Sequence, residues 1–475
     1  MRKLIVMLLC LGLLSGLALA FDPEPGAEGL GDPYYPDQGN GGYDAQHYTL
    51  DLAWDDVSGA IAGTVTIDAL ATQDLSAFNL DFWGFTVSDI LVNDTPATFT
   101  RDGGEMTITP AQPLAADSAF TVAVTYSGVP GEGVPEDSRP FGPGWMQYAS
   151  GVFVASEPNG ASFWYPVNDH PQDKASYTFR ITVSNAYVVA ANGLLQDTIS
   201  EDKQLTYVFE TPYPVASYLV TVNIGQFIVQ RQEGPDGLPI RNYFPIAGFQ
   251  AAADTFKRTP DMIAFYSDIF APYPFEAYGV VMAATSLPFA LETQTLSLFG
   301  TGILTNNRPG GAEGVIAHEL SHMWFGDSVS VKTWKDIWLN EGFATYASWL
   351  WFEHDDGPQV LDNIVRDAYG AYTQPGILTS SVRIGDPSPE RLFDGAVYTR
   401  GALTLHALRM KVGDETFFNI LRTYYDRYQN SNAGIADFIA VAEELSGQDL
   451  GDFFDGWLYQ LDLPPIPEMG LQLGG

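Results

Sequence analysis

The stretch from Val315 to His322 reads VIAHELSH, with two histidines four residues apart and a glutamate directly after the first. Residues four apart lie on one face of an α-helix, so His318 and His322 can present their rings to the same metal ion. Glu319 is turned about 100° around the helix axis from His318, which places its carboxylate beside the metal. This arrangement is typical of a metal site whose glutamate acts as a general base. The alternative is a buried helix whose two histidines are satisfied by backbone groups.

A third protein ligand is expected because a hydrolytic zinc site has three protein ligands and one open position. The segment 338–344 reads WLNEGFA, and its Glu341 stands nineteen positions after His322. A carboxylate in so apolar a segment is costly unless it is paired or bound to metal. A rival pattern would have a glycine and a third histidine where Phe325 and Ser328 stand. We therefore predict one zinc ion per chain, held by His318, His322 and Glu341.

The periodicity of apolar residues changes along the chain and indicates two domains. Alternation predicts strands at 48–52, 63–68, 120–126, 177–183, 218–222 and 278–282, and an extended stretch at 287–299. Helices are predicted at 251–270 with a break near Pro260, and at 312–325, 336–352, 397–412, 415–428 and 435–446. We assign 21–244 to an antiparallel all-β domain, 245–467 to a mixed catalytic domain and 468–475 to a tail. The fold class is therefore α+β.

The first twenty residues have the pattern of a secretory signal. Arg2 and Lys3 give a basic start, 4–17 is apolar, and Ala18-Leu19-Ala20 offers a small-residue cleavage site. We expect cleavage after Ala20 and a secreted, extracellular or periplasmic location. An uncleaved anchor and lipid attachment at Cys10 are the minor alternatives.

The charge balance is strongly acidic. The chain has 22 basic and 58 acidic residues and a formal net charge of -36. Nucleic acid and anionic membranes would be repelled, so we expect neither nucleic-acid binding nor stable membrane association after signal cleavage. The single cysteine excludes a disulfide framework and a cysteine-rich zinc module. A saline habitat, bound calcium and the oligomeric state stay open.

The chain resembles the M1 family of zinc aminopeptidases, the gluzincins that include aminopeptidase N and leukotriene A4 hydrolase. The resemblance rests on HELSH, on the following MWFG at 323–326 and on WLNEG at 338–342, with weaker likeness in GNGGYD at 39–44 and WYPVNDHP at 164–171. It implies a saddle-like amino-terminal β domain followed by a thermolysin-like catalytic domain. The chain looks like a short form without the family's helical carboxy-terminal domain, and we expect a more open active site.

The resemblance also implies roles for residues that would be anonymous without it. The family's G-x-M-E-N strand corresponds to Phe289-Ala290-Leu291-Glu292-Thr293, which keeps the glutamate that binds the substrate's α-ammonium and changes its neighbours. Glu157 in Ser156-Glu157-Pro158 corresponds to a second amine-binding acid. Tyr398, before Arg400-Gly401, corresponds to the tyrosine that stabilises the oxyanion.

The resulting hypothesis is a secreted zinc aminopeptidase that hydrolyses N-terminal residues from peptides through a zinc-activated water. Glu319 would take the proton of that water, and the substrates would be peptides with a free amino terminus. The alternatives are a zinc endopeptidase of the same fold, an epoxide hydrolase as in one branch of the family, and a non-catalytic peptide-binding relative. We interpret Trp349, Trp351 and Phe352 as helix packing, and the remaining four histidines as structural.

Overall fold

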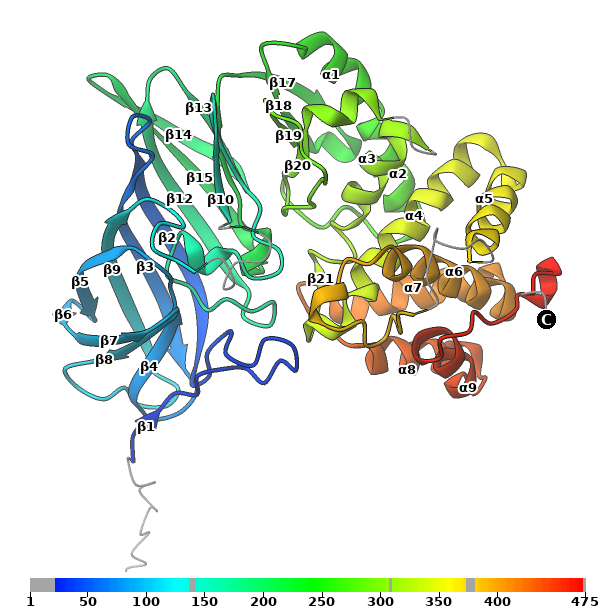
Figure 1. Cartoon of the computed structure of the whole chain (residues 1–475), viewed down its shortest axis with the longest axis horizontal. Coiled ribbons are helices and arrows are strands. Elements are labelled where there is room, and N and C mark those ends of the chain that lie inside the picture. Colours follow the sequence, from blue (N-terminus) through cyan, green and yellow to red (C-terminus); the bar gives the residue numbers. More distant parts are fainter. Residues whose placement is uncertain (1–21, 136–141, 143, 307–309, 373–380, 473–475) are drawn as a thin grey trace, which may run out of the picture.

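The computed structural model describes residues 22–472 except 136–141, 143, 307–309 and 373–380. Sheets make up the amino-terminal half and helices dominate the carboxy-terminal half, so the predicted α+β fold class is confirmed (Figure 1). The predicted signal at 1–20 lies outside the described residues. Within the described residues, no helix combines the length and the apolar character needed to cross a membrane.

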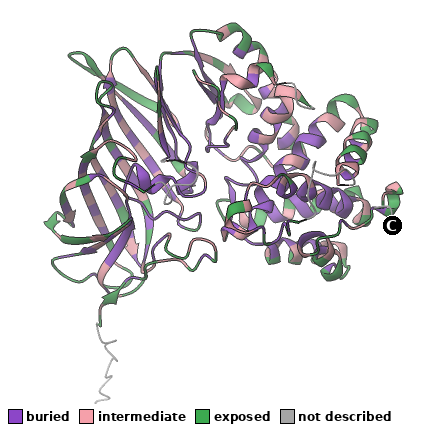
Figure 2. Ribbon diagram, in the orientation of Figure 1, coloured by how far each residue is buried: buried purple, intermediate pink, exposed green. Residues whose placement is uncertain are grey.

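The largest sheet has eight strands in the order β14-β15-β12-β2-β3-β9-β5-β6. Their bounds are β2 Tyr43–Trp54, β3 Ile61–Ala71, β5 Thr86–Val92, β6 Thr95–Pro96, β9 Ala119–Gly128, β12 Ala175–Ser184, β14 Leu194–Glu201 and β15 Gln204–Val215. Buried and less buried residues alternate along β2, β3, β9 and β12, as expected for strands with one face on a core (Figure 2). The sheet is not wholly antiparallel, because β12 pairs with β2 in parallel. Local patterning could not reveal this pairing, since the two strands are more than a hundred residues apart.

Two smaller sheets complete this half of the molecule. One contains β1 Glu24–Pro25, β4 Leu75–Asp81, β7 Thr98–Asp102 and β8 Glu105–Thr109, and the other β10 Trp145–Tyr148, β11 Gly151–Val154, β13 Val188–Ala191 and β16 Val222–Gly225. The strand expected at 218–222 is largely absent. Ser217–Leu219 forms a 3-10 turn, and β16 begins at Val222.

A four-stranded sheet stands at the start of the catalytic half. Its strands are β17 Phe227–Glu233, β18 Pro239–Pro245, β19 Val280–Ala283 and β20 Ser297–Gly300, in that order. The Gly234–Gly237 turn lies within the β17–β18 hairpin. The sheet therefore includes chain on both sides of position 244, where the sequence analysis placed a boundary. Only the end of the stretch 287–299, expected to be extended, lies in β20.

Helices form the rest of the catalytic half. Their bounds are α1 Phe249–Thr255, α2 Thr259–Ile269, α3 Gly311–Ser321, α4 Trp338–Asp356, α5 Pro358–Ala371, α6 Gly395–Val412, α7 Asp414–Tyr428, α8 Ile435–Ser446 and α9 Gly451–Phe454, with strands β21 Val329–Val331 and β22 Ser431–Ala433 between them. The break expected near Pro260 separates α1 from α2, with that proline in the first turn of α2. Helix α5 was not predicted. Pro358 starts it directly after α4, and Leu361, Val365 and Tyr369 form its buried stripe.

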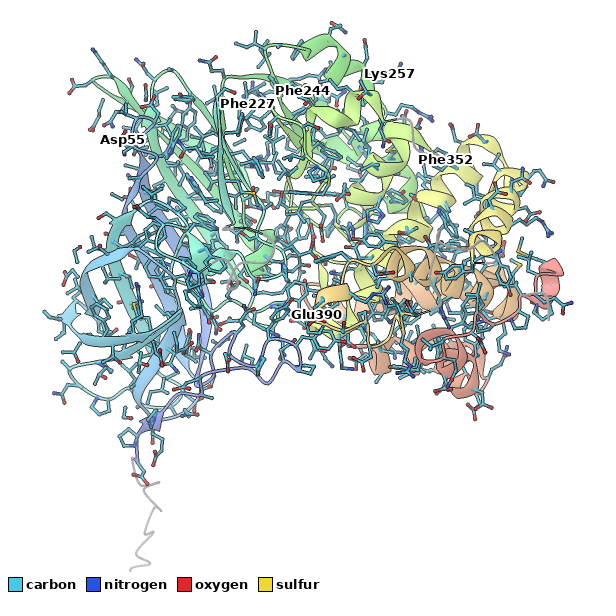
Figure 3. The ribbon with its side chains drawn as sticks, viewed as in Figure 1. Asp55, Phe227, Phe244, Lys257, Phe352 and Glu390 are labelled. Carbon is cyan, nitrogen blue, oxygen red and sulfur yellow. The ribbon has the colours of Figure 1, made fainter. Side chains whose placement is uncertain are left out.

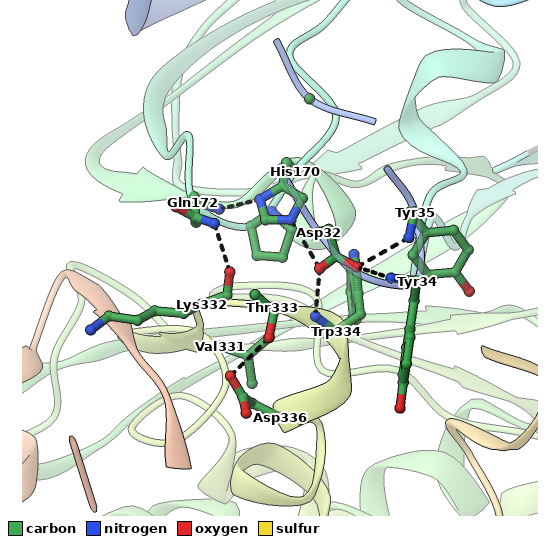
Figure 4. A network of polar contacts seen from close by, with 12 residues as sticks. Asp32, Tyr34, Tyr35, His170, Gln172, Val331, Lys332, Thr333, Trp334 and Asp336 are labelled. Carbon is green, nitrogen blue, oxygen red and sulfur yellow. Dashed lines mark hydrogen bonds and ion pairs between the residues drawn. The ribbon is translucent and has the colours of Figure 1, made fainter. Parts of the chain in front are cut away.

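The lead-in before β2 joins the two halves through one buried carboxylate (Figure 4). Asp32 accepts hydrogen bonds from the backbone N–H groups of Tyr34 at 2.7 Å, Tyr35 at 3.1 Å and Trp334 at 2.8 Å. Its Oδ2 is also 3.3 Å from Nε2 of His170. Trp334 opens the 3-10 turn that leads into α4, so this network fixes the start of that helix against the β domain.

Candidate metal centre

Helices α3 and α4 bring three predicted ligands together. His318 and His322 are one turn apart on α3, and Glu341 is in the first turn of α4. The Nε2 atoms of His318 and His322 are 3.1 Å apart. Oε2 of Glu341 is 3.1 Å from Nε2 of His318 and 3.6 Å from Nε2 of His322. A tetrahedral zinc with bonds of about 2.0–2.1 Å separates its ligand atoms by about 3.3 Å. The donor set therefore fits zinc in both chemistry and spacing.

Backbone and hydroxyl groups orient the two imidazoles from behind. Nδ1 of His322 is 3.0 Å from the carbonyl oxygen of Phe325, so we assign the ring proton to Nδ1, which donates to that carbonyl. This tautomer leaves the Nε2 lone pair free for a metal. Nδ1 of His318 is 3.5 Å from Oγ1 of Thr345. Gly326 permits the approach behind His322, since a Cβ there would come within 2.9 Å of Nδ1.

The electrostatics of the centre favour a cation. Burial opposes charge on Glu341, but the neighbouring His318 and His322 side chains lower its pKa to about 2. Burial likewise opposes charge on His322, yet Glu292 and Glu341 raise its pKa well above the usual value. The two imidazoles thus stand among more carboxylates than they can neutralise, which a divalent ion would correct.

Glu319 and Tyr398 flank the three ligands. Glu319 is 6% exposed, and its carboxylate, that of Glu292 and a ring nitrogen of His322 have ligand atoms within 4.8 Å of one another. Burial raises the pKa of Glu319 well above that of an ordinary carboxyl, which suits a group that accepts and returns a proton. The Tyr398 ring stacks on His318 with centroids 5.9 Å apart, and burial raises its pKa, so the hydroxyl stays a donor.

Glu157 and Glu292 form a second acidic group beside the metal ligands. Oxygens of Glu157, Glu292 and Glu341 lie within 4.8 Å of one another. Among the described residues, Oε1 of Glu157 and Oε1 of Glu292 are buried without a hydrogen-bond partner. Burial raises the pKa of both carboxyls. Buried carboxylates lacking partners are costly, so this pair calls for a cationic group from outside the protein.

Two glycines set the spacing between Glu341 and Tyr398. Gly342 on α4 faces Gly401 on α6, and a Cβ on Gly401 would lie only 2.7 Å from Cα of Gly342. Asp394 caps the amino-terminal end of helix α6, because its side chain accepts a hydrogen bond from the backbone N–H of Ala396 at 2.9 Å. Its Arg400 is buried and donates to the backbone carbonyls of Gly456, Trp457, Gln460, Leu461 and Asp462.

All seven predicted site residues line one cavity of about 1030 Å³. No described residue lining the cavity is a lysine or arginine. Sequence reasoning missed part of its wall, namely Met146, Phe289 and Phe393, and it interpreted the wall residues Trp349 and Phe352 as helix packing. Their apolar spacing is the same as that of packing residues, so no local signal distinguished them.

Comparison with known proteins places these features in one family. The peptidase family M1 domain matches residues 255–457, and the peptidase M1 N-terminal domain matches residues 44–219. Glutamyl aminopeptidase of Bitis rhinoceros is 28% identical over 325 residues, which are 65% of this chain and 34% of the relative. The human glutamyl aminopeptidase is 27% identical over 341 residues, which are 69% of this chain and 36% of the relative. The chain thus spans about one third of the length of these curated relatives.

Solved structures resemble almost the whole chain. An M1 zinc metallopeptidase from Deinococcus radiodurans is 31% identical, with 94% of this chain and 100% of that chain covered and a TM-score of 0.82. A mutant of that enzyme bound to a Tyr-Ser-Ala substrate is likewise 31% identical. The match covers 92% of this chain and 99% of that chain, with a TM-score of 0.83. Further two-domain M1 structures hold L-tryptophan and L-arginine.

Proposed function

The chain belongs to peptidase family M1, and on that premise we propose that it is a zinc-dependent aminopeptidase that removes N-terminal residues from peptides. The observation that carries the proposal is a pair of carboxylates, half-buried Glu157 and buried Glu292, each with one buried oxygen that lacks a partner, beside a three-residue zinc ligand set. A peptide's α-ammonium group supplies the missing cation. Its first peptide carbonyl then lies at the metal centre, which fixes cleavage after one residue.

Each remaining residue has a part in hydrolysis. One zinc ion, held by His318, His322 and Glu341, supplies when bound a Lewis acid that polarises the scissile carbonyl and acidifies water. The Glu319 carboxylate takes a proton from the attacking water and delivers it to the leaving nitrogen. The Tyr398 hydroxyl donates a hydrogen bond to the carbonyl oxygen as negative charge develops there.

The cavity also suggests which amino-terminal residues are accepted. Four glutamates line it, and none of its described lining residues is a lysine or arginine. An acidic side chain would meet like charge, whereas apolar and cationic side chains would not. We therefore propose that the enzyme prefers substrates whose amino-terminal residue is apolar or basic. This preference would differ from the glutamyl residue in the name of the glutamyl aminopeptidases. The tryptophan and arginine held by two-domain M1 structures agree with this proposal.

The location proposed is outside the cytoplasm, on the basis of the basic-then-apolar pattern of residues 1–20. The net charge of -36 supports a protein without nucleic-acid partners and without stable attachment to anionic membranes.

Two comparisons test the activity. Leucyl and arginyl dipeptides should be cleaved, and their N-acetylated forms should be poor substrates because Glu157 and Glu292 then lack a cationic partner. Equal rates would indicate the alternative, an endopeptidase whose altered segment around Glu292 does not bind the amine.

The zinc-loaded Glu319→Gln variant should lose roughly 10²–10⁴-fold in kcat, the usual contribution of a general base. A variant that kept both zinc and full turnover would contradict the assigned role. A wild-type protein that bound peptide and zinc without turnover would be the non-catalytic relative.

A further inference from the structure

The cavity continues beyond the metal centre along α4. Trp349 and Phe352 line the same cavity as Glu341 and stand eight and eleven residues after it on the helix. At about 1.5 Å of rise per residue, they lie about 12 and 16 Å along the axis from Glu341. Gly314, one turn before His318 on α3, faces this part of α4, since its Cβ would come 3.4 Å from the Phe352 ring.

Large apolar side chains dominate this extension. We define the apolar trough as Trp349 and Phe352 of α4, Val360 and Ile364 of α5, and Phe393 just before α6. Trp349 is 9% exposed and the other four are half-buried. Phe352 lies on the side of the molecule where α3, α4 and α5 meet (Figure 3). Apolar side chains gathered in one concavity beside a reactive centre are typical of a ligand-binding surface.

The position of the amine site gives a bound peptide its direction. Glu157 and Glu292 have oxygens within 4.8 Å of a Glu341 oxygen, at the beginning of α4, whereas Trp349 and Phe352 are two and three turns further on. A peptide whose amino group lies at the two glutamates and whose first carbonyl lies at the metal centre leaves its later residues beyond the metal. The cavity continues there as the apolar trough.

We propose that the apolar trough binds the fourth and fifth residues of an oligopeptide substrate and selects apolar side chains at those positions. An extended chain advances about 3.3 Å per residue, so the distance of about 12–16 Å from Glu341 to Trp349 and Phe352 corresponds to about four or five residues of peptide. This inference rests on the proposed function, because the amine site and metal centre define the direction of the peptide. Trp349 and Phe352, which the sequence analysis interprets as packing, are then substrate-binding residues.

Kinetics with paired peptides test the proposal. The two substrates are hexapeptides that begin with leucine and end with lysine, one with Phe, Leu, Val and Phe between them and the other with Ser, Gly, Ser and Gly. Wild-type kcat/KM should be at least about ten-fold higher for the apolar peptide, and Phe352→Ala should lower that ratio about ten-fold, as expected for a truncated aromatic anchor. Phe418→Ala is the matched control, because that half-buried ring lies on α7 and does not line the cavity.

The same ratio in wild type and Phe352→Ala, or no preference in wild type, overturns the proposal. Ile364→Ser, on the half-buried face of α5, provides a second variant in case Phe352→Ala does not fold. It should lower the ratio in the same direction, and an unchanged ratio in that folded variant would overturn the proposal.

Equilibrium binding separates this inference from the peptidase activity. The zinc-loaded Glu319→Gln protein should bind a fluorescently labelled apolar hexapeptide with a free amino terminus about ten-fold more tightly than the same protein carrying Phe352→Ala. If wild type hydrolyses neither peptide but this difference is found, the peptidase proposal fails and the trough stands. Equal affinities of the two proteins for the peptide would overturn the proposal that the apolar trough binds substrate, whether or not the wild-type enzyme hydrolyses either peptide.

Discussion

Substitution of Gly401 by alanine should lower turnover by moving Tyr398 away from the metal centre. The new Cβ would stand 2.7 Å from Cα of Gly342, whereas ordinary contact begins near 3.4 Å, so α4 and α6 must separate by about 0.7 Å. A misplacement of about 1 Å costs roughly 100-fold in rate, and we therefore expect kcat to fall roughly 10- to 100-fold. That loss corresponds to about 1.4–2.7 kcal/mol of transition-state stabilisation.

The assay compares kcat, KM and zinc content in folded Gly401→Ala, Tyr398→Phe and the double variant. KM and zinc content should be retained, because the Tyr398 hydroxyl acts mainly on charge that develops in the transition state. In the Tyr398→Phe background, Gly401→Ala should cost less than about three-fold, since the two changes remove one interaction. The matched control is Gly370→Ala on α5, where a Cβ would meet no atom within 4 Å. Full kcat in Gly401→Ala, or the same fold loss in both backgrounds, would refute this reasoning.

Three further substitutions test other parts of the structure. Glu292→Gln should raise KM at least about ten-fold for a free-amine dipeptide and leave any hydrolysis of the N-acetylated form unaltered, because a charge-assisted hydrogen bond contributes about 1.5–3 kcal/mol; parallel losses on both substrates would argue against amine binding. Asp32→Asn should lower the free energy of unfolding by about 1–3 kcal/mol, because the amide nitrogen is a donor only and leaves either the Tyr34 and Tyr35 N–H groups or His170 and the Trp334 N–H without an acceptor; an unchanged denaturant midpoint would show that the network is dispensable. Arg400→Met should lower the free energy of unfolding by at least about 3 kcal/mol, because several backbone carbonyls lose their hydrogen-bond donor. A melting temperature within a degree or two of the wild-type value would contradict this expectation.

The metal ligands could be predicted because their signal is local. His318 and His322 lie on one helix at a spacing that helical geometry makes meaningful, and Glu341 is a buried charge in an apolar segment. Helix limits were predicted to within a few residues for α3, α4, α6, α7 and α8 for the same reason. Helix α5 was missed, although its buried stripe repeats every four residues after Pro358.

The remaining site residues depend on tertiary structure. Glu157 follows β11 and Glu292 precedes β20, yet their carboxylates approach one another across 135 positions of sequence. Neither residue has a local pattern that marks it, and only the family resemblance suggested both. The parallel pairing of β12 with β2 likewise depends on contacts between distant segments. The turn at Gly234–Gly237 is compatible with either a domain boundary or a hairpin, and the sequence pattern alone does not distinguish the two.

Anomalous diffraction from crystals of catalytically active protein at the zinc absorption edge would test the central claim most directly. The account predicts a single strong peak per chain, about 2.0–2.2 Å from Nε2 of His318, Nε2 of His322 and a carboxylate oxygen of Glu341. A peak bound by other side chains, or active crystals without any zinc signal, would contradict it.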